Sequence, residues 1–260
     1  MHRRALMAGA LAWPWRSGAW SLPGQSTLDV VFDDGSVPTM YRDGQGTGAL
    51  GLYPALVGAA LAGMSPPARL RAQPFKRVLA ELMAGTAVAG AVIRTPEREQ
   101  RCLFSQPYFI ERLSVFSLRG RVPPFRRLPD LNGRRVGVIR GWSYGAGFDQ
   151  PRARGDFICE DVASDALNFE KLVRQRLDYV VATELGGRLH LQRVSTGDSP
   201  VIEGEQSVAA TPIHLAVLQT APGAAEFLAH FDQHVVRLVN DGTAASLMAR
   251  ELERAARLMS

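Results

Sequence analysis

The sequence holds few of the residues that build disulfide frameworks or metal sites. Among its 260 residues are only two cysteines, Cys102 and Cys159, and five scattered histidines. Two thiols do not make a disulfide framework, and no group of Cys and His residues has the spacing of metal ligands. We therefore expect no metal and no cofactor. Whether the two thiols pair is open from these residues alone.

Lysine is also nearly absent, because Lys76 and Lys171 are the only lysines among 30 basic side chains. With 25 acidic side chains the sequence pI is about 9.7, a value that invites a nucleic-acid interpretation. However, Arg3, Arg4 and Arg16 lie in an N-terminal segment that looks removable and holds no acid. Without them the balance is 27 basic against 25 acidic side chains, a net charge of +2. This charge gives no general attraction for nucleic acid, so we expect no nucleic-acid partner.

The N-terminus has the three parts of a signal peptide in the expected order. Residues 1–4 are basic, residues 5–15 are mostly apolar, and Ala19 and Ser21 offer an A-x-S cleavage site. The apolar stretch is shorter than the roughly 20 residues of a membrane span, so we expect no stable membrane insertion. We predict that residues 1–21 are removed on export to the periplasm. The Sec route and the Tat route both stay open, and the alternative is an apolar tail on a cytoplasmic protein.

The rest of the chain predicts an α/β fold. With 46% hydrophobic residues it can build a large core. Apolar runs typical of strands alternate with stretches of helical spacing, which indicates a mainly parallel sheet. The predicted strands are 28–32, 68–72, 88–93, 136–139, 179–182 and 213–218, and the predicted helices are 52–64, 75–83, 163–176, 224–239 and 244–259.

Two blocks of motifs resemble a known family. The first block comprises Pro74-Phe75-Lys76-Arg77, Leu82 with Gly85, Thr95-Pro96-Glu97-Arg98, and Phe104-Ser105-Gln106-Pro107-Tyr108. The second block comprises Leu131-Asn132-Gly133-Arg134-Arg135-Val136-Gly137-Val138, followed by Gly141. In order and spacing these motifs resemble the extracytoplasmic solute-binding proteins of ABC importers, polar amino-acid type, known as solute-binding family 3.

The resemblance runs from about Leu28 to the C-terminus and implies the type II periplasmic-binding-protein fold. This fold has two α/β lobes with the ligand cleft between them, and the lobes close around the ligand at a hinge. The implied boundaries are 22–118 for the first part of lobe 1, 119–211 for lobe 2, and 212–260 for the return to lobe 1 and the C-terminal helices. The two cysteines then fall in different lobes, which favours two separate thiols. We expect a monomer.

Arg98 is the strongest candidate for a ligand-binding residue. In the family, the arginine of the T-x-E-R motif holds the ligand carboxylate, and a planar guanidinium group can do so with two hydrogen bonds. Thr95 would add a hydroxyl group, and exposed backbone at Ile93 would add donors and acceptors. The alternative for Arg98 is a surface ion pair with Glu97 or Glu99.

A second set of candidates follows the predicted strand 136–139. Trp142, Ser143 and Tyr144 stand where the family contacts its ligand with a hydroxyl group and with N–H groups at a helix N-terminus. Such a position favours anions. The alternative for the two aromatic residues is packing in the wall of the cleft.

The first lobe offers further candidates near its first strand. Asp33 and Ser36 fall near the usual binding turn of the family, and Tyr41 or Phe75 could stack on the ligand. Plain turn chemistry explains Asp33-Asp34-Gly35 equally well.

The chain departs from the family at the expected ammonium site. Amino-acid binders place an aspartate about five residues after the R-L-D of the second lobe, where this chain has Thr183 with Glu184 beside it. A buried ammonium group needs a carboxylate partner. Unless Glu184 turns into the cleft, we predict weak binding of common α-amino acids and better binding of a carboxylate that lacks the ammonium group.

The resemblance thus predicts a protein that binds a small polar, carboxylate-bearing solute and delivers it to an ABC permease. One alternative is a periplasmic sensory or partner-binding module with a sensor partner. Another is an enzyme, since the same fold hosts dehydratases and lytic transglycosylases. No histidine sits in a recognisable nucleophile or acid–base arrangement, so we expect no catalysis.

Overall fold

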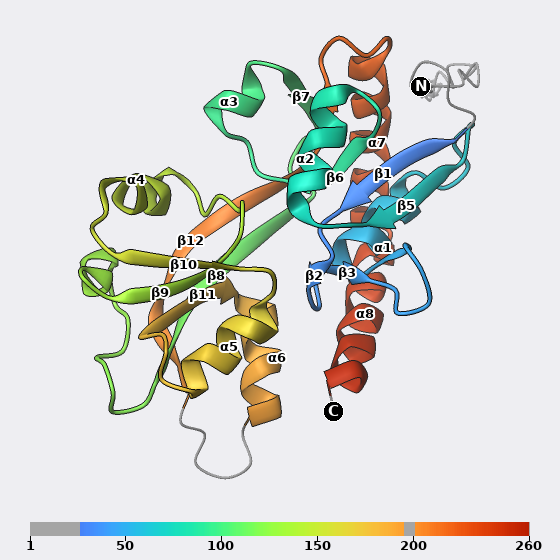
Figure 1. Cartoon of the computed structure of the whole chain (residues 1–260). Helices are drawn as coiled ribbons and strands as arrows, with labels where there is room; N and C mark the ends of the chain where they lie inside the picture. The colour runs from blue at the N-terminus through green and yellow to red at the C-terminus, as the bar shows by residue number, and fades with distance from the viewer. Residues whose placement is uncertain (1–26, 195–200, 260) are drawn as a thin grey trace, which may run out of the picture.

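The computed structural model describes residues 27–194 and 201–259, which fold into two α/β lobes (Figure 1). A nine-stranded curved sheet runs through both lobes in the strand order β10-β9-β11-β8-β12-β6-β1-β5, with β7 paired to β12. The predicted two-lobed α/β fold is therefore confirmed. The predicted signal peptide, residues 1–21, lies outside the described residues.

The first lobe is built around β1 (Leu28–Phe32), whose five residues are all buried. β1 pairs in parallel with β5 (Ala68–Ala72) and β6 (Val88–Val92). β5 lies at one edge of the sheet, and apolar and basic residues alternate along it. The other elements of this lobe are β2 (Gly35–Ser36), β3 (Met40–Arg42), β4 (Ala49–Leu50), β7 (Cys102–Phe104), α1 (Leu52–Ala60), α2 (Phe75–Ala84), α3 (Pro96–Glu99), α7 (Ala224–Asn240) and α8 (Thr243–Met259).

Helix α2 shows how local sequence fixes an element beside the cleft. Phe75, Val78 and Leu82 recur at helical spacing and are all buried, so one face of α2 packs against the sheet. Gly85 ends the helix with φ near +69°, a conformation that favours glycine. The helix predicted over 75–83 is confirmed and extends to Ala84.

The second lobe repeats the parallel arrangement. β9 (Arg135–Ile139) lies between β10 (Ile158–Val162) and β11 (Tyr179–Thr183), parallel to both. The helices of this lobe are α4 (Ala146–Arg154), α5 (Asp165–Val173) and α6 (Glu184–Val194), and a short 3-10 turn covers Leu128–Leu131. Its core is separate from that of the first lobe and gathers around Tyr144, Phe148 and Phe157.

Two long antiparallel strands join the lobes, β8 (Phe109–Leu118) and β12 (Val201–Leu218) (Figure 1). β8 pairs with β11 of the second lobe, whereas the C-terminal part of β12 pairs with β6 and β7 of the first. The predicted lobe boundaries fall at the end of β8, residue 118, and within β12, at residues 211–212. The division of the chain at these residues stays a prediction.

Several predicted elements have different lengths in the structure. The strand predicted over 213–218 is only the end of the 18-residue β12. The helices predicted over 52–64 and 163–176 are shorter, Leu52–Ala60 and Asp165–Val173. Cys102 and Cys159 lie in different lobes as free thiols.

Two kinds of feature are missing from the described part of the chain. Within residues 27–194 and 201–259, no helix has the length and hydropathy needed to cross a membrane. The same residues hold no group of three or more Cys, His, Asp or Glu side chains placed to bind a metal ion.

Candidate functional site

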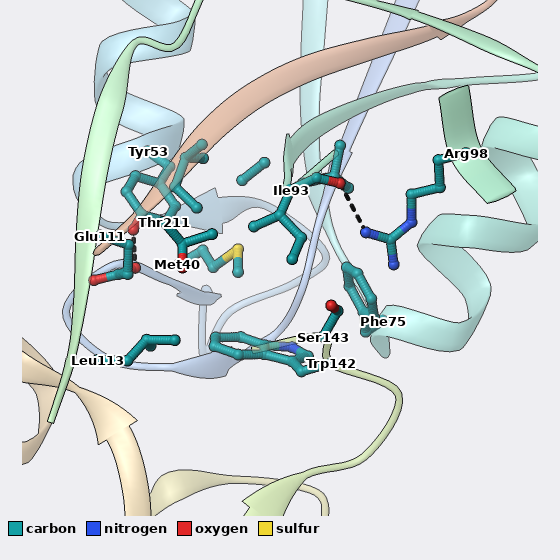
Figure 2. Close-up of a pocket in the computed structure, with 13 residues that line it drawn as sticks. Met40, Tyr53, Phe75, Ile93, Arg98, Glu111, Leu113, Trp142, Ser143 and Thr211 are labelled. Carbon is teal, nitrogen blue, oxygen red and sulfur yellow. Dashed lines mark hydrogen bonds between the residues drawn. The ribbon is translucent and has the colours of Figure 1, made fainter. Parts of the chain in front are cut away.

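A pocket lies between the two lobes, and side chains from both lobes and from the joining strands line it (Figure 2). The first lobe and the loop after β9 supply its polar end, with Arg98 and Ser143. The strands β8 and β12 supply the other end. The complete lining is Met40, Tyr53, Phe75, Ala91, Val92, Ile93, Arg98, Glu111, Leu113, Trp142, Ser143, Thr211 and Ile213.

Arg98 is held in place by the short helix α3. Thr95 caps this helix, since its Oγ1 accepts a hydrogen bond of 3.3 Å from the Arg98 backbone N–H. The Arg98 guanidinium donates through Nη1 to the Ile93 carbonyl oxygen at 2.9 Å and lies 5.6 Å from the centre of the Phe75 ring. These contacts fix the guanidinium at one end of the pocket.

Glu97 and Asp149 act on Arg98 electrostatically, but neither forms an ion pair with it. The residue is only 7% exposed, and no carboxylate among the described residues forms an ion pair with it. Burial lowers the pKa of Arg98, yet a guanidinium group stays protonated in proteins. A buried cation without a partner is costly, so this end of the pocket is suited to an anion.

The loop after β9 brings Ser143 and Trp142 to the pocket from the second lobe. The Ser143 hydroxyl donates to Asp149 Oδ2, and Asp149 Oδ1 accepts from the Tyr144 N–H at 3.1 Å. Figure 2 shows Ser143 on the same side of the pocket as Arg98, with Phe75 beside them. The two lobes therefore both contribute polar groups to the end that suits an anion.

Trp142 also links the two lobes directly. Its indole Nε1–H donates to Asp33 Oδ2 of the first lobe at 2.8 Å, and its ring meets Phe75 edge-on, with 6.4 Å between the ring centres. Asp33 is 4% exposed, and burial raises the pKa of its carboxyl group to about 6. Asp33 thus accepts a hydrogen bond from Trp142, a residue of the pocket lining, and does not itself line the pocket.

The lobes also approach each other closely at two glycines, Gly35 of the first lobe and Gly186 of the second. A Cβ atom at Gly35 would lie 2.7 Å from the carbonyl oxygen of Ala163, and one at Gly186 would lie 2.9 Å from that of Val37. Both contacts join the turn after β1 to the second lobe. The backbones approach too closely there for any side chain, so the structure shows the lobes in contact on this side of the cleft.

Asp165, at the start of α5, is a buried acid beside this contact. It is 2% exposed, and neither carboxyl oxygen has a hydrogen-bond partner among the described residues. A Cβ atom at Gly186 would lie 3.7 Å from its Oδ2. Burial, with a smaller effect of Asp33, raises the pKa of Asp165 to about 7.

Asp165→Asn is expected to stabilise the ligand-free protein at pH 8 and to change little near pH 4. The folded-state pKa of about 7 lies above the unfolded value of about 4, so the destabilising effect of the acid appears as the pH rises between them. Above pH 7 this effect is on the order of a few kcal/mol. Thermal unfolding at both pH values measures it, with Asp156→Asn, a surface acid paired to Arg154, as the control. Equal melting temperatures of Asp165→Asn and wild type at pH 8 would contradict the prediction.

Glu111 lies at the end of the pocket opposite Arg98 (Figure 2). It belongs to β8 and is 4% exposed, and its Oε2 accepts a hydrogen bond from the Tyr53 hydroxyl group. Burial raises the pKa of Glu111 well above its usual range, and Asp165 and Glu184 raise it further. Burial at this end of the pocket thus favours the protonated form of the Glu111 carboxyl group.

The structure brings five of the residues predicted from the sequence together in the pocket lining. They are Phe75, Ile93, Arg98, Trp142 and Ser143. Two more support them from behind, since Thr95 caps the helix of Arg98 and Asp33 bonds to Trp142.

Five other predicted residues do not line the pocket. Ser36 and Tyr41 are buried in the small sheet of β2 and β3. Tyr144 is in the core of the second lobe, where its hydroxyl accepts from the Ile139 N–H at 2.7 Å. Thr183 Oγ1 accepts from the Gly186 N–H at 3.1 Å, and Glu184 forms ion pairs with Arg112 and Arg188 at 3.3 and 2.6 Å.

Sequence reasoning missed the part of the pocket that comes from α1, β3, β6 and the joining strands. The missed residues are Met40, Tyr53, Ala91, Val92, Glu111, Leu113, Thr211 and Ile213. The signal for Glu111 is its place three residues after the Phe104–Tyr108 motif, where the chain leaves the first lobe. A single acid next to Arg112 gives no further hint, because such a pair is also typical of a surface strand.

Comparison with known families gives one match that covers most of the chain. The model of the bacterial extracellular solute-binding proteins, family 3, matches residues 28–253. No protein with a curated description matches the sequence.

Solved structures with the same fold include three informative ones. One is an ancestral arginine-binding protein bound to arginine, 21% identical, with 87% of this chain and 98% of that chain covered and a TM-score of 0.73. A histidine kinase sensor domain with similarity to periplasmic binding proteins is 24% identical, with coverage of 87% and 96% and a TM-score of 0.73. The third is the ancestral amino-acid-binding protein AncCDT-1, a precursor of cyclohexadienyl dehydratase, 18% identical, with coverage of 87% and 96% and a TM-score of 0.71. At these identities the likeness shows the fold alone.

Proposed function

Since the chain belongs to the bacterial extracellular solute-binding proteins, family 3, we propose that it binds a small polar solute carrying a carboxylate. The solute would be captured in the cleft between the lobes, in the periplasm, and handed to an ABC-type importer. We keep cleavage of a signal peptide near Ser21 as part of this proposal. The protein would bind and release this solute without changing it chemically.

One observation carries this proposal, the buried guanidinium of Arg98, which lies in the pocket without an ion pair among the described residues. A carboxylate placed there would accept two parallel N–H bonds and would supply the missing counter-charge. Ser143 from the second lobe lies on the same side of the pocket. A carboxylate bound between Arg98 and Ser143 would therefore contact both lobes and favour their closed arrangement.

Two other roles share this fold. A sensory role draws support from the similar histidine kinase sensor domain, and catalysis draws support from the similar precursor of a dehydratase. A sensor would bind the same kind of ligand but hand the signal to a kinase, so co-purification with a permease or with a kinase separates the two. An enzyme would release a ligand of changed mass, which mass spectrometry of the bound and released ligand detects.

A thermal-shift screen of the mature protein against organic acids, amino acids and amines tests the proposed function. We expect carboxylates to raise the melting temperature, since a ligand at a hundredfold excess over its dissociation constant stabilises the native state by about 2.7 kcal/mol. Amines without a carboxylate should have no effect. Stabilisation by such amines alone, with none by any carboxylate, would contradict the proposal.

A further inference from the structure

The pocket has a second polar end that the resemblance to the family does not assign. Glu111 and Tyr53 form it, and Figure 2 shows them at the far side of the pocket from Arg98. The Tyr53 ring is fixed by edge-on contacts with Tyr108 and Phe109, with 5.9 and 5.3 Å between ring centres. Because the Tyr53 hydroxyl donates to Glu111 Oε2, the carboxyl group is held in one position.

Three buried acids in and around the cleft form no ion pair among the described residues. Over the described ranges, Glu111, Asp165 and Asp33 form no ion pair with any Arg, Lys or His side chain, although all three are at least nine-tenths buried. Glu184 is different, because Arg112 and Arg188 both pair with it. Of the two acids that act on Glu111, Asp165 thus has no compensating cation in the described part of the chain, whereas Glu184 has two.

The field of these acids favours a positive charge over a neutral group. Burial is the main cause of the raised pKa of Glu111, and Asp165 and Glu184 add to it; burial likewise raises the pKa of Asp165, with a smaller effect of Asp33. A cation next to Glu111 would favour its ionised form and would gain a charge-assisted hydrogen bond in a site of low dielectric constant. A cation bound beside Glu111 would therefore shift this carboxyl group from its protonated toward its ionised form.

The walls between the two ends are apolar. Met40, Ile93, Leu113 and the Trp142 ring lie between Arg98 and Glu111 in Figure 2. These side chains suit the methylene groups of an aliphatic chain. A ligand that reaches both ends must therefore carry its two polar groups on separate carbons, with apolar carbon atoms between them.

We propose that Glu111, positioned by Tyr53, is a specificity-determining residue that binds a positively charged group of the ligand. The ligand class is then an aliphatic carboxylate with an amine or guanidine group at the other end of its chain. This inference rests on the proposed function, because it takes Arg98 as the carboxylate site. The positive group is recognised at the joining strand β8, and not at Thr183, where an ammonium anchor was expected from the family.

Calorimetric titration of the full mature protein tests this inference with matched pairs of ligands. The probes are 4-aminobutanoate, 5-aminopentanoate and 6-aminohexanoate, each against the same acid without the amine, with 2-aminopentanoate as the α-amino isomer. At least one terminal amine should improve affinity about tenfold or more over its matched acid and over the α-amino isomer. Binding of that amine should also release a proton, seen as a dependence of the heat on the buffer.

Glu111→Gln should abolish the advantage of the amine and the proton release, while the affinity for the plain acid changes less than about threefold. The control is Glu184→Gln, which removes a neighbouring acid outside the pocket lining and should keep the advantage. Should Glu111→Gln fail to fold, Tyr53→Phe takes its place, because it keeps the ring but removes the donor to Glu111. The advantage should then fall at least about threefold.

The outcomes separate this inference from the proposed function. If the advantage of the amine survives both Glu111→Gln and Tyr53→Phe, or if no amine has an advantage, the inference is overturned. The proposed function still stands in that case, provided that Arg98→Ala abolishes binding of the plain acids. If no carboxylate of either series binds, the proposed function falls, and this inference falls with it.

Discussion

Arg98→Ala is expected to abolish carboxylate binding while the protein keeps its fold. Removing one partner of a buried charge-assisted pair costs about 2–5 kcal/mol, which lowers affinity by a factor between about 30 and several thousand. The ligand-free protein should not lose stability by a similar amount, because the Arg98 side chain makes a single hydrogen bond within residues 27–194 and 201–259, to the Ile93 carbonyl. Titration of both proteins with a carboxylate found in the ligand screen measures the effect.

Arg94→Ala is the matched control for this experiment. Arg94 is an arginine four residues away, it is half exposed, and it forms an ion pair with Glu99 at 2.9 Å. It does not line the pocket. Its removal should change affinity less than about threefold, since exposed ion pairs contribute at most about 1 kcal/mol. Equal affinities of wild type and Arg98→Ala would place Arg98 outside the binding site.

Trp142→Ala is expected to open the cleft and to destabilise the protein by about 3 kcal/mol. The Trp142 ring packs against the cores of both lobes, and its Nε1–H bonds to Asp33 across the cleft. Without it, Asp33 loses a hydrogen-bond donor and the lobes lose a shared contact. Thermal unfolding and small-angle X-ray scattering of the ligand-free protein measure the two effects, a lower melting temperature and a larger radius of gyration.

Trp142→Phe separates packing from the hydrogen bond. It keeps an aromatic ring in the cleft but lacks the N–H donor, so it should destabilise by about 1–2 kcal/mol, less than alanine does. Asp33→Asn is the complementary control, because an amide oxygen can still accept from Trp142. An unchanged radius of gyration in Trp142→Ala would show that the contact does not hold the lobes together.

Fully buried strands are predicted well from the sequence, whereas two of the partly exposed strand segments are missed. The strand 28–32 is predicted correctly because all five of its residues are apolar or buried in the sheet. β10 is missed, because it is an edge strand whose residues 158–161 are partly or fully exposed. The first part of β12 is missed for the same reason, since polar residues and glycine interrupt its apolar positions and Pro212 argues against a central strand.

The candidate site shows a similar limit. Motif positions give Arg98, Ser143 and Trp142, because these residues follow strand ends where the backbone path is fixed by local sequence. Glu111 depends on which side of β8 faces the cleft, and this is set by pairing with β12 and β11, residues far away in the chain. No local sequence pattern indicates which face of β8 lines the cleft. Tyr53, which reads as an ordinary helical core position, becomes informative only when Glu111 is placed against it.

The joining strands have a mechanical consequence for the order in which ligand contacts form. Glu111 and Thr211 face each other in the register of β8 and β12, at the place where the chain passes from one lobe to the other. When two lobes close at a hinge, residues near the hinge move little and residues far from it move most. Arg98 and Ser143 lie on opposite lobes, so a ligand could contact both only when the lobes are closed, whereas Glu111 lies on the joining strand β8 and could contact the ligand before closure. A ligand would thus be contacted first at the joining strands and last by Arg98 and Ser143 of the two lobes.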